Sequence, residues 1–262
     1  MKIYISADME GLPGERHWSD VNKGEKGYKR SLKEMTAEVS LVCKTLLKNG
    51  VGSITVRDSH GTAKNLNDLD LPDAVQLVSG WTDNLYGMME FVSRSYNGAI
   101  FIGYHAPAGS KHNPLGHFYT TKAWRVKLNG EPLSELRLNT YIAAQEGVPV
   151  LCVMGDEDVC REAKNLIKGV MTIESWSQKS LTSGNKTLGL QIRKAVSAGL
   201  KLKPNIPKLP KHYDLEVEYH FSRDMRKVIG IKGIRVIKRA GNTVFFRANS
   251  LNNLLRTINS VL

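Results

Sequence analysis

Acidic residues and histidines follow several short apolar runs of this sequence. In chain order they are Asp8, Glu10, Asp58, His60, His105 and Asp156. Carboxylates and imidazoles are the ligands that Zn²⁺ and related divalent ions use in proteins, and a bound dication offsets the cost of burying an acid. If the apolar runs form one sheet, these side chains meet and suit a two-metal hydrolase centre, in which one carboxylate bridges the ions.

The spacing of the first two acids supports this hypothesis. Asp8 and Glu10 lie two residues apart and could point the same way from an extended segment. Gly11 and Gly14 give the backbone beside them more conformational freedom. A fifth candidate ligand, Glu135, stands in the first turn of a predicted helix. That position would aim its carboxylate at the same crevice.

Each residue also has a plainer interpretation. Asp-x-Glu after a strand commonly serves a loop or a helix cap, and Ser59-His60 alone is more typical of a turn than of a ligand. Asp156 suits the N-cap of a helix beginning at Glu157. Ligand-type residues at the ends of three successive strands nevertheless favour a site, although they do not identify the metal.

The elements that must position these side chains alternate between strands and helices. Apolar runs rich in β-branched residues predict strands at residues 3–7, 53–56, 99–104 and 148–154, and a weaker run at 74–78. Between the first two, residues 28–47 carry apolar side chains at three- and four-residue steps, which predicts a helix. This alternation predicts an α/β fold with a mostly parallel sheet flanked by helices, and a binding crevice at the carboxyl ends of its strands.

The amino-acid composition of the sequence changes near residue 199. Residues 200–213 are rich in Lys and Pro and predict an extended linker. Beyond it we expect a strand at 215–221, a hairpin at 233–248 and a terminal helix with Ser250 as its N-cap. We therefore predict a catalytic α/β domain at 1–198 and a small basic α+β domain at 199–262, with residues 106–134 able to pack against the latter.

Composition limits the classes of protein. The chain has 262 residues, 41% of them hydrophobic, and no apolar run long enough to cross a bilayer. We find no secretory signal and expect a cytoplasmic location without membrane partners. The net charge of +12 arises mainly after residue 200, where thirteen Lys or Arg stand against four Asp or Glu. Cys43, Cys152 and Cys160 show no Cys-x-x-Cys spacing, which indicates buried free thiols.

Five ordered motifs resemble those of the zinc D-aminopeptidase family, which includes a dipeptide-operon D-aminopeptidase. They are Asp8-Met9-Glu10-Gly11, Asp58-Ser59-His60, Gly103-Tyr104-His105-Ala106, Ser134-Glu135-Leu136-Arg137-Leu138-Asn139 and residues 148–156. The resemblance is strong over residues 1–160 and looser beyond. It implies two Zn²⁺ ions per subunit, held by Asp8 as the bridge, Glu10 and His60 on one ion, and His105 and Glu135 on the other.

The resemblance also implies a catalytic histidine, a homo-oligomer and a substrate. His117 matches the family's catalytic histidine, and His112 is the alternative. The resemblance also implies a ring-like decamer that encloses its active sites. Arg137 replaces a usual glycine and could bind a substrate carboxylate or face solvent. The segment 176–190 fits the family poorly, so substrate preference could differ.

The function expected from these features is a metal-dependent aminopeptidase. It would hydrolyse short peptides with an N-terminal D-amino acid through water activated by two zinc ions. An alternative is an amidase or peptidase acting on peptides derived from the cell wall. Binding of nucleic acid by the basic C-terminal quarter is a third hypothesis, which the absence of any known nucleic-acid module disfavours.

Overall fold

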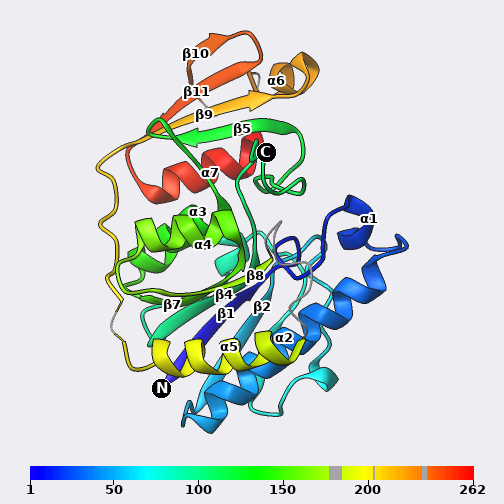
Figure 1. Cartoon of the computed structure of the whole chain (residues 1–262). Coiled ribbons are helices and arrows are strands. Elements are labelled where there is room, and N and C mark those ends of the chain that lie inside the picture. Colours follow the sequence, from blue (N-terminus) through cyan, green and yellow to red (C-terminus); the bar gives the residue numbers. More distant parts are fainter. Residues whose placement is uncertain (177–184, 203, 230, 232–234) are drawn as a thin grey trace.

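A six-stranded parallel sheet forms the larger part of the molecule (Figure 1). The computed structural model describes residues 1–176, 185–202, 204–229, 231 and 235–262. The strands, in spatial order, are β3 (Val75–Val78), β2 (Ser53–Asp58), β1 (Lys2–Ala7), β4 (Gly98–Tyr104), β7 (Val150–Asp156) and β8 (Met171–Trp176). The five predicted strand regions all lie in this sheet, and the predicted α/β fold class is confirmed.

Helices cover both faces of this sheet, as the continuous apolar runs of its central strands require. They are α2 (Tyr28–Lys48) and α5 (Asn185–Gly199) on one face, and α3 (Glu135–Gln145) and α4 (Glu157–Leu166) on the other (Figure 1). One apolar core lies on each side. Tyr4 and Phe101 belong to the α3 and α4 side, whereas Ile3 and Ile5 pack on the α2 and α5 side.

The helix predicted at residues 28–47 is α2. Its buried residues include Met35, Val39, Val42 and Leu46, which recur along one face of the helix. The helix ends at Asn49-Gly50, where Gly50 has a φ of 81° and turns the chain toward β2. Shorter helical turns are α1 (Trp18–Val21), η1 (Asp68–Asp70) and η2 (Gly87–Met89).

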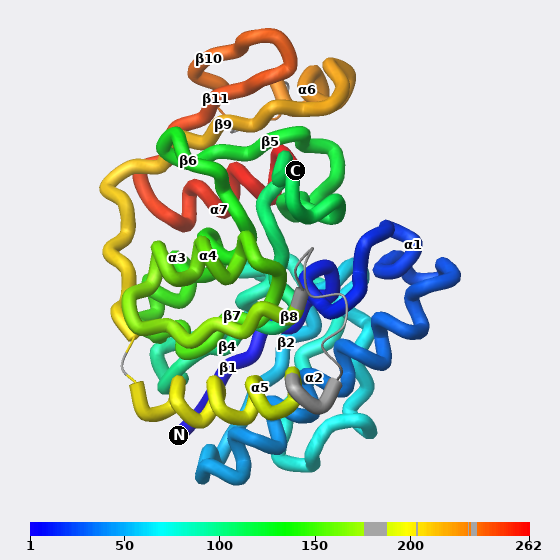
Figure 2. Tube along the Cα trace, viewed as in Figure 1, coloured from blue at the N-terminus to red at the C-terminus, as the bar shows by residue number. Residues whose placement is uncertain are grey.

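A second, antiparallel sheet of five strands lies beyond α3 and α4. Its strands, in spatial order, are β10 (Val236–Ala240), β11 (Thr243–Ala248), β9 (Tyr213–Tyr219), β5 (Ala123–Leu128) and β6 (Glu131–Pro132). The sheet thus joins residues from the middle and the end of the chain. In Figure 2 the red α7 (Leu251–Val261) lies between this sheet and the helices over the parallel sheet.

Several C-terminal predictions are confirmed in detail. Ser250 is the N-cap of α7, and its hydroxyl accepts from the backbone N–H of Asn253. Residues 200–202 and 204–212 contain neither helix nor strand, and the hairpin turns at Gly241. The start of the predicted hairpin at 233–234, and residues 177–184 of the segment 176–190, lie outside the described residues.

Other elements were not predicted. They are α1, η1, η2, β5, β6, β8, α5 and α6 (Ser222–Ile229). Cys43, Cys152 and Cys160 are buried free thiols, as predicted. The division into domains at residue 199 stays a prediction. No helix in the described parts of the chain combines the length and apolar character needed to span a bilayer.

Candidate metal centre and active site

The candidate site lies where the strand order of the parallel sheet reverses. From neighbouring strands β1 and β4, the chain winds outward in opposite directions, which opens a crevice at the carboxyl ends of these two strands. Asp8 directly follows β1, and His105 directly follows β4. The sheet therefore brings residues about a hundred positions apart in the sequence to one place.

Glycines allow the two strand ends to approach closely. A Cβ atom on Gly11 would lie 1.8 Å from the carbonyl oxygen of Tyr104, and one on Gly103 would lie 2.1 Å from that of Asp8. Gly103 also has a φ of 69°, which disfavours other residues. The backbone N–H of Gly11 donates to the Gly103 carbonyl at 2.8 Å. The Gly11 of the first motif thus serves the packing of the strand ends against each other.

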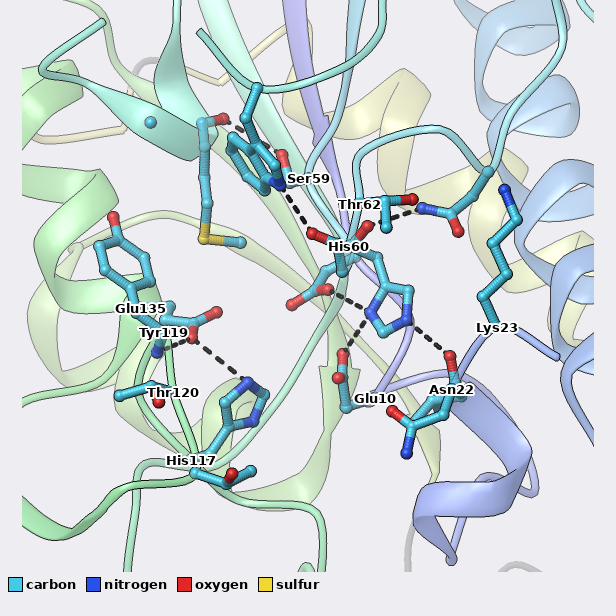
Figure 3. A pocket seen from close by; sticks show the side chains of 18 of the residues that line it. Glu10, Asn22, Lys23, Ser59, His60, Thr62, His117, Tyr119, Thr120 and Glu135 are labelled. Atoms are coloured by element: carbon cyan, nitrogen blue, oxygen red, sulfur yellow. Dashed lines mark hydrogen bonds and ion pairs between the residues drawn. The ribbon is translucent and has the colours of Figure 1, made fainter. Parts of the chain in front are cut away.

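The structure brings the five predicted metal ligands and the predicted catalytic histidine into one cluster, and Figure 3 shows Glu10, His60, His117 and Glu135. The residues of the cluster are Asp8, Glu10, His60, His105, His117 and Glu135. The five predicted metal ligands are each at most 6% exposed. His117 is less buried and lines the cavity.

Asp8 lies between two sets of donor atoms. Its Oδ1 is 3.4 Å from His60 Nδ1, which is also 3.0 Å from Glu10 Oε2. Its Oδ2 is 3.6 Å from His105 Nε2, which is 3.5 Å from Glu135 Oε2. The cluster therefore has two halves that share the Asp8 carboxylate.

Backbone carbonyls set the tautomer of each histidine. His60 Nε2 lies 2.8 Å from the Val21 carbonyl, His105 Nδ1 lies 2.8 Å from that of Ala106, and His117 Nδ1 lies 3.0 Å from that of Leu115. Because a carbonyl can only accept, each ring places a proton on that nitrogen. The other nitrogen of each ring faces the carboxylates. Metal-binding histidines are oriented in this way by their outer partners.

Burial and mutual charge shift the pKa values of these groups strongly. Desolvation raises the pKa of Asp8 to about 8, and the nearby Glu10 carboxylate adds to the rise. Desolvation disfavours charge on His60 and His105 too, but the carboxylates around them outweigh it and raise both pKa values well above the usual range. For Glu10 and Glu135 the adjacent imidazoles likewise overcome desolvation and lower the pKa. The cluster thus stabilises positive charge at the nitrogens between its carboxylates.

The donor set fits a divalent cation such as zinc. His105 Nε2 is buried without a hydrogen-bond partner among the described residues, although it points at two carboxylates. The donor atoms form two groups, and within each group they all lie within 4.8 Å of one another. One group is Asp8, Glu10 and His105, and the other is His105, His117 and Glu135. Nitrogen and carboxylate donors at such separations suit Zn²⁺.

The two candidate catalytic histidines lie in different places. The His117 ring stacks on His105 with centroids 4.5 Å apart, and Trp18 contacts it edge-on. Its Nε2 is 3.8 Å from Glu135 Oε1. His112 lies outside the cluster and pairs with Asp158 at 3.0 Å. Geometry therefore favours His117 as the histidine that can reach a reacting group.

The remaining strand-end acids do not face the cluster. Asp58 accepts from the backbone N–H groups of Asn65 and Leu66. Asp156 is the N-cap of α4, as predicted, and its Oδ2 accepts from the Ala106 N–H at 2.7 Å. These acids hold loops beside the site.

A strained turn at Tyr119 was missed by the sequence analysis. The N–H of Thr120 donates to the Phe118 carbonyl at 2.6 Å, with Tyr119 between them at a φ of 55°. Such three-residue turns with a positive central φ are rare and strained. The turn directs the Tyr119 N–H at Glu135 Oε1, at 2.7 Å. A Gly or Asn at this position would have predicted the turn, whereas Tyr gives no such signal.

Arg137 forms an ion pair between two helices. Its Nε donates to Glu162 Oε1 on α4 at 2.9 Å, and its side chain is 21% exposed. It is not among the residues that line the cavity. The sequence carries no sign of this ion pair, because the partner comes from the neighbouring helix.

All residues of the cluster except His105 line a cavity of about 820 Å³, which is within the usual size range for small-molecule sites. Trp18 and Trp81 contribute to its walls. The fully buried Arg57 holds the Trp81 segment. Its Nη1 donates to the Gly80 carbonyl at 2.6 Å, its guanidinium lies 4.5 Å from the Trp81 ring, and its Nη2 is 3.3 Å from Glu90.

Comparison with known proteins agrees with the resemblance seen in the motifs. The family model described as D-aminopeptidase matches residues 1–260. A D-aminopeptidase of Bacillus subtilis (strain 168) is 35% identical over 172 residues. That match covers 66% of this chain and 62% of the relative, which is less than two thirds of its length.

A solved structure shows the same fold. It is described as the Zn-dependent D-aminopeptidase DppA from Bacillus subtilis, a self-compartmentalizing protease. The TM-score is 0.90 at 28% sequence identity, and the superposition covers 100% of this chain and 96% of that one. The two sheets and their helices are therefore shared by both proteins.

Proposed function

Since this chain belongs to the D-aminopeptidase family, we propose that it is a zinc-dependent aminopeptidase that removes an N-terminal D-amino acid from short peptides. One observation carries the proposal. Three imidazoles, each with its proton directed to a backbone carbonyl, turn their other nitrogen toward three buried carboxylates. That arrangement needs a cation to stabilise it.

The two halves of the cluster support a site for two zinc ions. We assign Asp8 as the shared ligand because its two oxygens face different histidines. Glu10 and His60 complete one half, and His105 and Glu135 complete the other. Bound zinc supplies Lewis-acid chemistry, which polarises a peptide carbonyl and makes water a nucleophile at neutral pH.

We assign His117 the role of accepting a proton from the attacking water and passing it to the departing amine. The Leu115 carbonyl fixes its Nδ1 proton, so Nε2 is the atom that exchanges a proton with the substrate. Stacking on His105 and the contact with Trp18 hold the ring in one orientation. A positioned imidazole within reach of the reacting group suits general acid–base catalysis.

The proposals for the substrate and the assembly rest on the relatives. The preference for D-residues rests on the family and on the names of both Bacillus proteins. The cavity volume is consistent with short peptides. The solved relative is described as self-compartmentalizing, and we propose a homo-oligomer for this chain, with a ring of ten subunits as the specific expectation. Sedimentation of the purified protein tests this state.

Metal analysis combined with peptidase assays tests the proposed activity. The protein purified with zinc should contain two zinc ions per chain and hydrolyse D-Ala-D-Ala much faster than L-Ala-L-Ala. Chelation should abolish the activity, and zinc should restore it. Full activity after complete removal of metal, or equal rates on both peptides, would contradict the proposal.

A pair of histidine variants tests the role of His117. His117→Ala should lower kcat by about 10²-fold or more, since general acid–base catalysis contributes roughly 10² to 10⁴. His112→Ala is the matched control, because His112 is also near the site but pairs with Asp158 outside the cluster. Near-normal turnover of His117→Ala with zinc in place would remove this residue from the mechanism.

A further inference from the structure

Lys23 has an unusual position at the edge of the cavity. Among the described residues that line it, Lys23 is the one Lys or Arg side chain. The other polar side chains there are acids, histidines and neutral groups such as Asn22 and Asn84. A single cation beside an acidic site can discriminate between ends of a substrate that differ in charge.

The backbone holds Lys23 in a defined turn between α1 and α2. The N–H of Asn22 donates to the Trp18 carbonyl at 2.9 Å, and that of Glu25 donates to the Asn22 carbonyl at 3.1 Å. Lys23 Nζ donates to the Lys64 carbonyl at 3.4 Å. Lys23 takes part in none of the ion pairs between described residues. Its charge is therefore available to an anionic ligand.

Residues close in the sequence to Lys23 and to its partner Lys64 contact His60 of the cluster. The Val21 carbonyl, two residues before Lys23, accepts from His60. Asn65, which follows the Lys64 carbonyl that Lys23 contacts, donates to the His60 carbonyl at 2.7 Å. In Figure 3 Lys23 lies beyond His60, on the side away from Glu135 and His117. A ligand reaching from the cluster past His60 would meet the ammonium.

We infer that Lys23 binds the C-terminal carboxylate of a dipeptide-sized substrate and so favours very short peptides with a free carboxyl end. This inference rests on the proposed aminopeptidase function. An aminopeptidase holds the amine end of the peptide at the reacting centre, so the carboxylate points away from it. An extended dipeptide spans about 7 Å. An amidated dipeptide has no carboxylate, and a longer peptide carries its carboxylate further from the reacting centre.

Kinetics with a matched pair of substrates test the inference. The substrates are D-Ala-D-Ala and its C-terminal amide, which differ only in the charge at that end. The zinc-loaded protein should prefer the free acid by about tenfold in kcat/KM, mainly through KM, as expected for a charge-assisted hydrogen bond. Added salt should reduce this preference.

Lys23→Met should lower kcat/KM about tenfold on the acid, again through KM, and leave the amide nearly unchanged. Lys26→Met is the matched control, because Lys26 is exposed in the same loop but does not line the cavity. A variant that keeps the preference for the acid, or loses activity equally on both substrates, overturns the inference. So does a wild-type protein without the preference.

Failure of the proposed function would look different. If neither substrate is hydrolysed, the aminopeptidase proposal fails, and calorimetric binding of the acid and the amide to the same zinc-loaded protein decides the role of Lys23. Tighter binding of the acid that Lys23→Met abolishes supports the inference. Equal binding of both ligands overturns it.

Discussion

Buried carboxylates at the ends of the parallel strands fall into two groups. Asp58 and Asp156, at the ends of β2 and β7, accept hydrogen bonds from backbone N–H groups of the loops beside them. Asp8 and Glu10, after β1, face imidazoles instead, as does Glu135 at the start of α3. Both groups are almost completely buried. Their partners, and not their burial or their place on the sheet, distinguish them.

The difference separates a structural acid from a candidate ligand. A carboxylate that accepts from amide N–H groups is satisfied where it stands. A carboxylate that faces the unprotonated nitrogen of an imidazole is not satisfied until a proton or a metal ion lies between them. Substitutions of the candidate ligands should therefore reduce activity, whereas substitutions of the structural acids should reduce the stability of the fold.

Asp8→Asn should have the largest effect, on activity. The change preserves the shape of the side chain but removes the charge that both halves of the cluster share. We expect kcat/KM to fall by about 10³-fold or more. This exceeds the roughly 10- to 100-fold loss that is typical when a hydrogen-bond partner of a metal ligand is substituted. Zinc content should fall as well.

The stability of the same variant provides the control. Burial raises the pKa of Asp8 to about 8 in the metal-free protein, so a neutral amide should fold at least as well there. We expect the melting temperature in chelator to be unchanged or higher. Retention of zinc and activity, or collapse of the fold, would place Asp8 with the structural acids.

Glu38 on α2 extends the comparison to a carboxylate with neither kind of partner. It is 4% exposed, and neither oxygen has a hydrogen-bond partner among the described residues. Desolvation raises its pKa from 4.5 to about 8, and Glu34 adds to the rise. The folded state therefore binds a proton that the unfolded state releases between these pH values. The contribution of Glu38 to the free energy of unfolding is therefore most favourable below pH 4.5 and falls as the pH rises to about 8.

Glu38→Gln should remove this pH dependence. The variant and the wild type should have similar free energies of unfolding at pH 5, and the variant should be more stable at pH 9, on the order of 3 kcal/mol. Denaturant titrations at both pH values measure the difference. A constant difference across this range would mean that Glu38 is ionised in the folded protein.

Asp156→Ala should destabilise the fold by about 2 kcal/mol while zinc binding persists. The change removes the N-cap of α4 and leaves the backbone N–H of Ala106 and the side-chain amide of Asn113 without their acceptor. Denaturant unfolding and the zinc content of the folded fraction check both parts. Loss of zinc from a stable variant would show that Asp156 belongs with the ligands.

The sequence predicts the parallel sheet and its site because both depend on local patterns. Continuous apolar runs specify β1 and β4, and the rule that parallel strands present their carboxyl ends at one edge brings Asp8 and His105 together. By contrast, β5 pairs with β9, about ninety residues later in the chain. Its half-exposed pattern, with Trp124 outward, carries no local sign of that partner.

Side-chain partners were the least predictable part of the site. The donor to Glu135 is the backbone of Tyr119, whose strained turn depends on the surrounding loop. The position of Lys23 in the cavity depends on the turn after α1 and on the Lys64 segment. Each of these contacts joins segments whose relative placement comes only from the folded chain.

Arg137→Ala should have the smallest effect and sharpens the contrast with Lys23. Arg137 pairs with Glu162 between α3 and α4, outside the cavity lining. Its removal should cost about 0.5–1 kcal/mol of unfolding free energy, as for a partly exposed ion pair. The KM for D-Ala-D-Ala should not change, because the guanidinium does not reach the substrate. A KM that rises for the free acid but not for its amide would assign carboxylate recognition to Arg137.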